Sequence, residues 1–406
     1  MQEARGFADK AGSSTDHGGN VWGLKPPSWS GNGTCHGGNV WGAMQEFRLL
    51  LEEVLDFSAN LNPLGPPESV LRLLREQADM VRHYPEPQSS TLKRALAVQH
   101  DVPARQLIVG NGAAELIYLL CRVLKPARAL IPVPTFSEYE RAVRAVGGEV
   151  QFFPLGPEAD FALPLETLVR VIATGGYDLV VVCNPNNPTG TLTAREALVT
   201  LVRVAAQAGT FLLLDESFIG FLPDRGAVSL IGDVQDGSSN LFILNSLTKL
   251  YCLPGLRLGY GIGPEAIIKE MEGGRDPWSV NAPAQLAGLA CLDEVEYVQK
   301  SVALMSEQRA VLFQGLGSIP GVKPYPSAAN FLLCDLRASG ITAPAARKAL
   351  GCRGILIRDC SNFPGLDQYY ARVAVRMPAE NQRLLTELRA VLESPGKTHS
   401  NATYGY

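Results

Sequence analysis

The stretch Leu179-Val-Val-Val-Cys-Asn-Pro-Asn-Asn-Pro-Thr-Gly190 joins an uninterrupted apolar run to a rigid polar turn. Runs of this length with no polar interruption are typical of strands that are covered on both faces, as in parallel sheets. The two Asn-Pro steps and the closing glycine favour a fixed turn that holds its amide side chains in set directions. We therefore expect a buried strand with a polar site at its carboxyl end.

Similar apolar runs recur on both sides of this stretch, at residues 107–110, 129–133, 211–214, 241–244 and 258–262. Amphipathic segments at 113–124 and 194–208 are long enough to form the crossover helices between parallel strands. After a helical stretch from about 285 to 316 come shorter strands near 330–336, 355–358 and 370–375, and a final helix at 380–392. The pattern predicts an α/β fold with a mostly parallel sheet flanked by helices, plus a smaller α+β portion.

Composition and charge exclude several classes of protein. The 36 Lys and Arg residues against 40 Asp and Glu residues give a net charge of −4, so no basic field favours nucleic acid or an anionic membrane. No run is long and apolar enough for a membrane span, and the first residues lack the apolar core of a signal peptide. The five histidines and eight cysteines show no metal-ligand spacing. We expect a cytoplasmic protein without a metal site.

Polar segments follow five of the apolar runs directly. They are Gly110–Glu115, Pro134–Ser137, Asn184–Gly190, Asp215–Ser217 and Asn245–Lys249. Ligands of such sheets bind at the carboxyl ends of the strands, so we expect these segments to line one pocket.

Each residue type in these segments allows two interpretations. The glycines near Gly112 could bind an anion at a helix N-terminus or serve only the turn. Asp215 could pair with a buried cation or make a structural hydrogen bond. Lys249 could be a desolvated nucleophile or a solvated loop charge. Phe136 could stack on a planar ring or belong to the core.

The order of these motifs resembles the aspartate-aminotransferase-like (fold type I) enzymes that use pyridoxal 5'-phosphate (PLP), from about residue 56 to residue 392. In that family's terms Lys249 would bind the cofactor covalently, Asp215 would keep its pyridine nitrogen protonated, and Asn187 would hydrogen-bond the ring hydroxyl. Phe136 would stack on the ring, and Phe218 stands where many relatives have tyrosine. The resemblance places the cofactor phosphate against Gly112, Ala113, Ser246, Thr248 and Arg257, with Tyr84 reaching across a homodimer interface.

Within this family the chain resembles the threonine-phosphate decarboxylases of cobalamin biosynthesis, which are related to histidinol-phosphate aminotransferases. The resemblance rests on His36-Gly-Gly-Asn, on the segments 56–65 and 276–282, and on Ile357-Arg-Asp-Cys-Ser-Asn-Phe-Pro-Gly-Leu366 leading to Arg372 and Arg376. It implies PLP-dependent decarboxylation of L-threonine O-3-phosphate to (R)-1-amino-2-propanol O-2-phosphate. The alternatives are an aminotransferase for histidinol phosphate or a related phosphorylated amine and, more distantly, a non-catalytic regulator of the same fold.

The resemblance also implies how the substrate phosphate is held. Arg358 and Arg372, with His36 and Asn60, are our candidates for the phosphate clamp, although both arginines could instead form inter-domain salt bridges. If the phosphate occupies the arginine that grips the α-carboxylate in aminotransferases, the carboxylate is left perpendicular to the cofactor ring. This geometry favours decarboxylation, because only a bond perpendicular to the ring can pass its electrons into the π system.

The resemblance leads us to divide the chain into five segments. Residues 1–43 are expected to be a flexible extension, 44–75 an N-terminal arm with part of the small domain, 76–290 the large PLP-binding domain, 291–393 the C-terminal small domain and 394–406 a flexible tail. The extension contains His-Gly-Gly-Asn-Val-Trp-Gly twice, at 17–23 and 36–42. Helical spacing over 40–55 follows the second copy only, so we expect His36 to cap the site and the first copy to be dispensable. The alternative is that both copies are mobile arms and that His36 plays no part.

Overall fold

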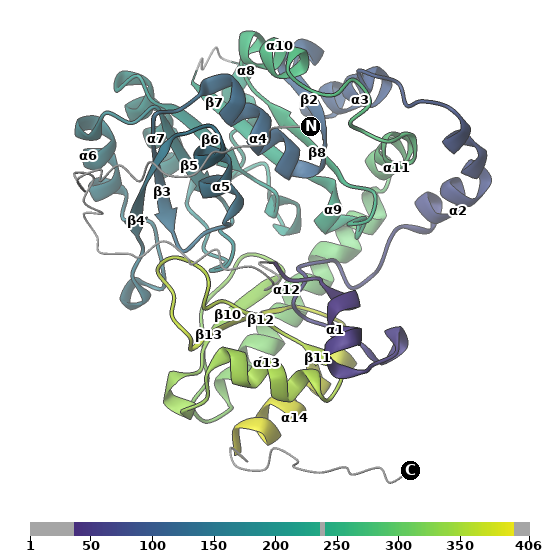
Figure 1. Cartoon of the computed structure of the whole chain (residues 1–406), viewed down its shortest axis with the longest axis vertical. Coiled ribbons are helices and arrows are strands. Elements are labelled where there is room, and N and C mark those ends of the chain that lie inside the picture. Colours follow the sequence, from purple (N-terminus) through teal and green to yellow (C-terminus); the bar gives the residue numbers. More distant parts are fainter. Residues whose placement is uncertain (1–35, 236–239, 394–406) are drawn as a thin grey trace, which may run out of the picture.

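The computed structural model describes residues 36–235 and 240–393. Figure 1 shows two parts: a large sheet with its helices in the upper half, and a smaller sheet with α13 and α14 in the lower half. The long helix α12 (Val295–Gly317) lies between them. The sequence predicted this division into a larger α/β part and a smaller α+β part.

The large sheet has seven strands in the order β2-β8-β7-β6-β5-β3-β4. β8 is antiparallel to both of its neighbours and the other pairs are parallel. The bounds are β2 Leu107–Asn111, β3 Arg128–Val133, β4 Glu149–Pro154, β5 Leu179–Cys183, β6 Phe211–Asp215, β7 Leu241–Ser246 and β8 Leu258–Ile262. Every predicted strand of this sheet is present. β4 was not predicted, because this edge strand begins with Glu149 and is less apolar than the others.

Helices cover both faces of this sheet, as the apolar strands require. Along β5, Val180 and Val182 belong to one buried cluster, while Leu179, Val181 and Cys183 belong to another on the opposite face. Helices α4 (Gly112–Leu124), α5 (Glu138–Ala145) and α10 (Glu265–Gly273) pack on the second cluster. Helices α3 (Ser90–His100), α6 (Leu165–Gly175), α7 (Arg195–Gln207) and α11 (Ala282–Leu292) pack on the first.

The smaller part contains an antiparallel sheet in the order β12-β13-β10-β9. Its strands are β9 Lys323–Pro324, β10 Phe331–Asp335, β12 Arg358–Asp359 and β13 Tyr370–Ala374. Helices α13 (Ala343–Gly351) and α14 (Pro378–Glu393) accompany it. The single helical stretch expected from 285 to 316 is divided into α11 and α12, which are separated at Asp293 and Glu294.

The N-terminal segment belongs to the smaller part. Helix α1 spans Val40–Phe47, and β1 (Leu55–Asp56) pairs in parallel with β11 (Ile355–Leu356). The helix expected over 40–55 ends at Phe47, because Arg48 adopts a left-handed conformation, and a short 3-10 turn at Leu51–Glu53 follows. The boundary expected at residue 43 lies inside α1. The first heptapeptide copy, at 17–23, lies outside the described residues.

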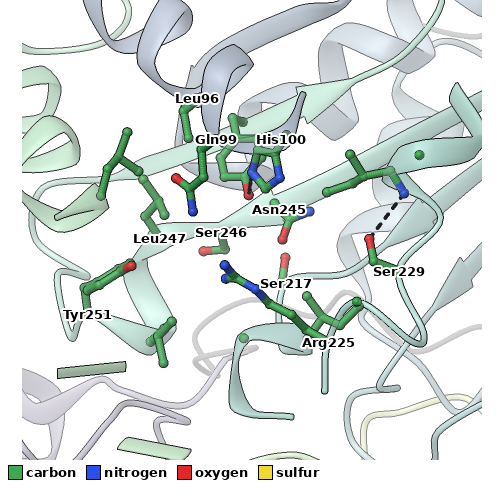
Figure 2. A pocket seen from close by; sticks show the side chains of 18 residues that line it. Leu96, Gln99, His100, Ser217, Arg225, Ser229, Asn245, Ser246, Leu247 and Tyr251 are labelled. Carbon is green, nitrogen blue, oxygen red and sulfur yellow. Dashed lines mark hydrogen bonds between the residues drawn. The ribbon is translucent and has the colours of Figure 1, made fainter. Parts of the chain in front are cut away.

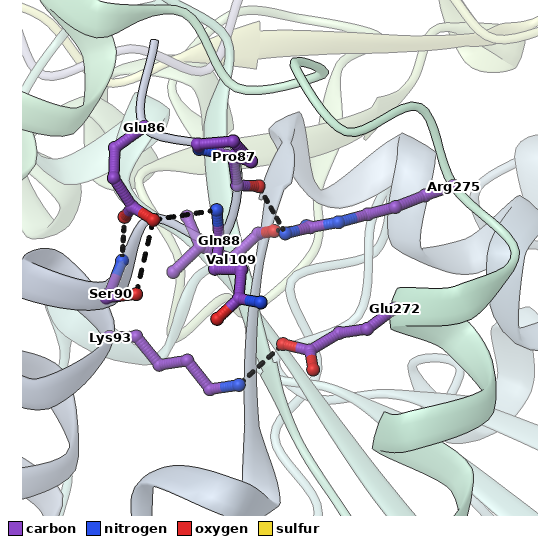
Figure 3. Close-up of polar contacts among 8 residues, drawn as sticks. All are labelled: Glu86, Pro87, Gln88, Ser90, Lys93, Val109, Glu272 and Arg275. Carbon is purple, nitrogen blue, oxygen red and sulfur yellow. Dashed lines mark hydrogen bonds and ion pairs between the residues drawn. The ribbon is translucent and has the colours of Figure 1, made fainter.

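Polar contacts join α3 and the loop before it to helix α10 and to Arg275, which follows α10 (Figure 3). Lys93 of α3 pairs with Glu272 at 2.5 Å, and Arg275 donates to the carbonyl oxygens of Pro87 and Val109. The remaining short elements are α2 Glu68–Glu76, η2 Ala78–Arg82, η3 Ala104–Gln106, η4 Pro157–Ala159, η5 Ile219–Phe221, α8 Ile231–Gln235, α9 Leu247–Leu250 and η6 Arg337–Ser339.

Candidate active site

The five polar segments predicted from the sequence lie at one edge of the large sheet. β2 runs in the same direction as β7, because each is antiparallel to β8, and β3, β5 and β6 share that direction. A cavity of about 470 Å³ lies where these strands end. Its lining contains all the predicted site residues except Gly112 and Tyr84, namely His36, Asn60, Ala113, Phe136, Asn187, Asp215, Ser246, Thr248, Lys249, Arg257, Arg358 and Arg372.

Lys249 lies in α9, one helical turn after β7 ends at Ser246. Burial lowers the pKa of its amine to about 8, and the charges of Arg372 and Arg257 contribute in the same direction. A larger fraction of the amine is therefore unprotonated near neutral pH than in a solvated lysine, which is the condition for attack on a carbonyl. This environment matches the nucleophilic interpretation of Lys249 and not that of a solvated loop charge.

Asp215 ends β6 and is 4% exposed. The Tyr139 hydroxyl donates to its Oδ2 at 2.6 Å, and the Ser217 amide donates to its Oδ1 at 2.8 Å. Burial raises the pKa of this carboxyl group, whereas both hydrogen bonds and the charge of Lys249 oppose that rise. Tyr139 was missed in the sequence, although it comes only two residues after the polar segment that ends at Ser137.

An anion cradle surrounds the start of α4. Gly112, the first residue of α4, has φ +75°, and a Cβ atom there would lie 2.5 Å from the guanidinium of Arg257. A Cβ atom on Gly259 would likewise lie 2.5 Å from the Ala113 amide nitrogen. The hydroxyls of Ser246 and Thr248 are 2.7 Å apart beside this cradle. Free amides at a helix N-terminus, a guanidinium and two hydroxyls suit a phosphate group.

Two buried arginines form the opposite wall of the cavity. Arg358 of β12 and Arg372 of β13 stand directly across from each other in the strand register and are 8% and 5% exposed. Arg358 donates to Asn362, while Arg372 donates to the Ser58 carbonyl at 2.8 Å. Burial and the charge of Arg358 lower the pKa of Arg372 to about 10. Like charges directly opposite each other are destabilising, so this pair favours an anion between or beside them.

Two asparagines place amide groups at the cavity. Asn60 is 4% exposed, and its side-chain oxygen has no hydrogen-bond partner among the described residues. The side-chain oxygen of Asn187 accepts from Arg372, so its amide nitrogen is the group suited to donate to a ligand. Phe218, 5% exposed, packs edge-on against Phe331 at 5.0 Å between ring centroids. It offers the cavity an apolar surface.

His36 and Tyr84 occupy different surroundings. The His36 ring is tilted against Phe136 at 5.6 Å, and its Nε2 lies 2.8 Å from the Glu138 carboxylate. Tyr84 is 79% exposed, its ring is tilted against that of Trp278 with 4.8 Å between centroids, and it does not line the cavity. Its predicted role across a dimer interface stays a prediction.

A second cavity, of about 290 Å³, lies under the loop that follows β6 (Figure 2). It shares Ser217 and Ser246 with the first cavity, and His100 is hydrogen-bonded to Tyr260 at its wall. Neither Lys249 nor Asp215 lines it, so the reactive groups belong to the first cavity.

Within residues 36–235 and 240–393, no cluster of three histidine, cysteine or acidic side chains could hold a metal, and no helix could span a membrane.

The residues of the first cavity fit a ring-shaped cofactor with a phosphate. An amine and a carboxylate face one space, the anion cradle lies beside them, and Phe136 supplies an aromatic ring. These groups come from successive strand ends of a single sheet, which holds them in a fixed relation.

Comparison with known proteins agrees with this geometry. Residues 52–388 match the model of the class I and II aminotransferase family. The chain is 40% identical to a threonine-phosphate decarboxylase of Salmonella typhimurium over 343 residues, 84% of this chain and 92% of that protein. It is 35% identical to a histidinol-phosphate aminotransferase of Symbiobacterium thermophilum over 345 residues, 84% of this chain and 91% of that protein.

A solved structure shows the same fold. It is a histidinol-phosphate aminotransferase of Sinorhizobium meliloti in complex with pyridoxal-5'-phosphate, with a TM-score of 0.74 and 26% identity over 83% of this chain and 90% of that chain. The family model, the relatives and the cavity lead to the same conclusion: this chain belongs to the class I and II aminotransferase family, with the fold of aspartate aminotransferase.

Proposed function

We propose that this protein is a PLP-dependent decarboxylase that converts L-threonine O-3-phosphate into (R)-1-amino-2-propanol O-2-phosphate, acting in the cytoplasm as a homodimer in cobalamin biosynthesis. One observation carries the proposal: two buried arginines, Arg358 and Arg372, lie side by side on neighbouring strands and line the cavity that contains Lys249. Such a pair suits a substrate that brings a dianionic phosphate in addition to its carboxylate.

The cavity offers each group that PLP requires. Lys249 would bind the cofactor covalently, Asp215 would pair with its pyridine nitrogen, and the cradle at Gly112 and Arg257 would hold its phosphate. When bound, PLP supplies an electron sink for the bond that breaks at the substrate Cα. Tyr139 keeps Asp215 in position through the 2.6 Å hydrogen bond.

The arginine pair orients the substrate. Binding of the substrate phosphate at Arg358 and Arg372 would leave the α-carboxylate without these arginines as partners, so that the carboxylate would be the group free to leave. Lys249, with a pKa lowered to about 8, is the group in the cavity best suited to move a proton to the substrate Cα. The apolar side chain of Phe218 excludes water from this wall.

The aminotransferase alternative shares the cofactor site and the need for a phosphate clamp. The higher identity to the Salmonella decarboxylase, 40% against 35% for the aminotransferase relative, favours decarboxylation. A non-catalytic regulator is disfavoured, because Lys249 and Asp215 are both present and share one buried cavity.

Product analysis tests the proposal. Threonine phosphate, supplied to the purified protein with PLP and no keto acid, should yield carbon dioxide and aminopropanol phosphate in equal amounts. Borohydride reduction and peptide mapping should locate the cofactor on Lys249. Strict dependence on 2-oxoglutarate would assign the protein to the aminotransferases, and labelling of another lysine would refute the assignment of Lys249.

A further inference from the structure

The segment His36–Asn39, which we call the strap, crosses from the smaller part of the molecule to the larger one. Figure 1 places α1, which follows the strap, beside α13 in the lower half, and α5 in the upper half. The His36 side chain nevertheless contacts Glu138, the first residue of α5, at 2.8 Å. This contact joins residues 102 positions apart in the chain and lies at the cavity that holds Lys249.

The strap fits closely against Ser58, whose carbonyl oxygen accepts a hydrogen bond from Arg372. A Cβ atom on Gly37 would lie 2.0 Å from the Ser58 carbonyl oxygen, and the Gly38 amide donates to the Ser58 hydroxyl at 2.8 Å. The same Ser58 carbonyl accepts from Arg372 at 2.8 Å. The two glycines therefore permit an approach that brings His36 to the same cavity as Arg372.

Glu138 is held as a carboxylate by several donors. Tyr118 donates to its Oε2 at 2.8 Å, and Arg141 donates to its Oε1 at 3.1 Å. Burial acts to raise the pKa of Glu138, but the hydrogen bonds from His36 and Tyr118 and the nearby positive charges hold it below its ordinary value. An ionised carboxylate can only accept hydrogen bonds, so Nε2 of His36 carries a proton in this pair.

We infer that Glu138 is a positioning residue for the substrate phosphate: it holds the His36 ring at the cavity through Nε2 and leaves Nδ1 as the nitrogen that meets the phosphate. Glu138 thus supplies the orientation that lets His36 contact the phosphate beside Arg358 and Arg372. The inference rests on the proposed function, because it assumes a phosphorylated substrate.

Other charged groups share the cavity with His36. They are Asp56, Asp215, Lys249, Arg257, Arg358 and Arg372. Glu138 lies outside the cavity lining, so a substitution there acts on the substrate only through His36 or through the packing of α5. A matched control exists in the same helix. Glu140 is 3% exposed and pairs with Arg144 at 2.8 Å, with no contact to the strap.

The experiment measures KM and kcat for threonine phosphate in the PLP-loaded enzyme with Glu138→Gln, Glu138→Ala, His36→Ala and Glu140→Gln. Glu138→Gln keeps an acceptor but removes the charge, and we expect KM to rise several-fold. Glu138→Ala should raise KM by about tenfold or more, as His36→Ala does, because a charge-assisted hydrogen bond is lost. In each case kcat should change little. Glu140→Gln should leave both constants and the cofactor absorbance unchanged.

The double variant His36→Ala/Glu138→Ala decides whether the two residues act as a unit. If Glu138 acts through His36, the double variant should bind no more weakly than His36→Ala alone. Additive losses, an unchanged KM in Glu138→Ala, or a loss confined to kcat would overturn the inference. Calorimetric titration of inorganic phosphate into the same holoenzymes gives the same comparison without turnover. A failure of decarboxylation would therefore not be confused with a failure of this inference.

Discussion

The floor and the mouth of the cavity are built in different ways. Lys249, Asp215 and the anion cradle at Gly112 form the floor, and each follows directly from the end of a strand in one sheet. Arg358, Arg372 and His36 form the mouth, and they come from the smaller sheet and from the N-terminal strap. The floor is a property of one rigid sheet, whereas the mouth exists only where the two parts of the molecule meet.

This difference predicts a division of labour. In the proposed function, floor residues would touch the cofactor and the reacting bond, so their loss should reduce kcat. Mouth residues would touch the part of the substrate that does not react, so their loss should raise KM for phosphorylated substrates.

The largest effect is expected for Lys249→Ala. Loss of the amine removes the covalent attachment of the cofactor and the group proposed to move the proton, and the proton-transfer role alone is worth about 100- to 10,000-fold. Steady-state decarboxylation, with added PLP and with methylamine as a possible rescuing amine, measures the loss. Activity within tenfold of the parent would show that Lys249 has neither of these two roles.

Asp215→Asn should reduce kcat on the order of 100- to 1,000-fold, because an amide cannot stabilise a protonated ring nitrogen and so weakens the electron sink. Cofactor binding, followed by absorbance, should be largely retained. A kcat within a few-fold of the parent would show that the ring nitrogen is not used as proposed.

Arg358→Ala and Arg372→Ala should weaken binding of threonine phosphate by about 2–5 kcal/mol, the usual cost of removing one partner of a buried charged contact. Unphosphorylated threonine should be affected far less. The ratio of kcat/KM for the two substrates measures this selectivity. An equal loss for both substrates would mean that the arginines bind the carboxylate or only join the two parts of the molecule.

Tyr139→Phe offers a finer test of the floor. Asp215 would lose the 2.6 Å hydrogen bond that opposes the rise of its pKa on burial, so that pKa should increase further. We expect kcat to fall by roughly tenfold, consistent with about 1.5 kcal/mol for a hydrogen bond to a charged group. The acid limb of the kcat–pH profile should move to higher pH. A profile identical to that of the parent would leave Tyr139 with a packing role alone.

The smallest effect is expected for deletion of residues 1–30, which removes the first heptapeptide copy and leaves His36 in place. Activity and KM should stay within about twofold of the full chain, because the second copy, with His36 at the cavity, is retained. An inactive truncation, or greater damage from His17→Ala than from His36→Ala, would reverse the assignment of the two copies.

Much of the floor could be predicted because its signals are local. Covered strands leave continuous apolar runs, and polar residues that follow such runs must meet at one edge of the sheet. The edge strand β4 was missed because Glu149 interrupts the apolar pattern at its start. Helix α1 is shorter than the spacing of apolar residues over 40–55 suggested. It ends at Phe47 because Arg48 takes a left-handed conformation, which hydrophobic periodicity does not predict.

The sequence by itself determined the strands of the large sheet and the order of the polar segments at their ends, since each depends on a short stretch of chain. Only the tertiary structure decided which distant side chains meet. Arg358 lies beside Arg372 through strand register, Tyr139 reaches Asp215 across 76 positions, and His36 reaches Glu138 across 102. Such contacts depend on how strands and helices pack, and packing is set by the whole buried core and not by any local pattern.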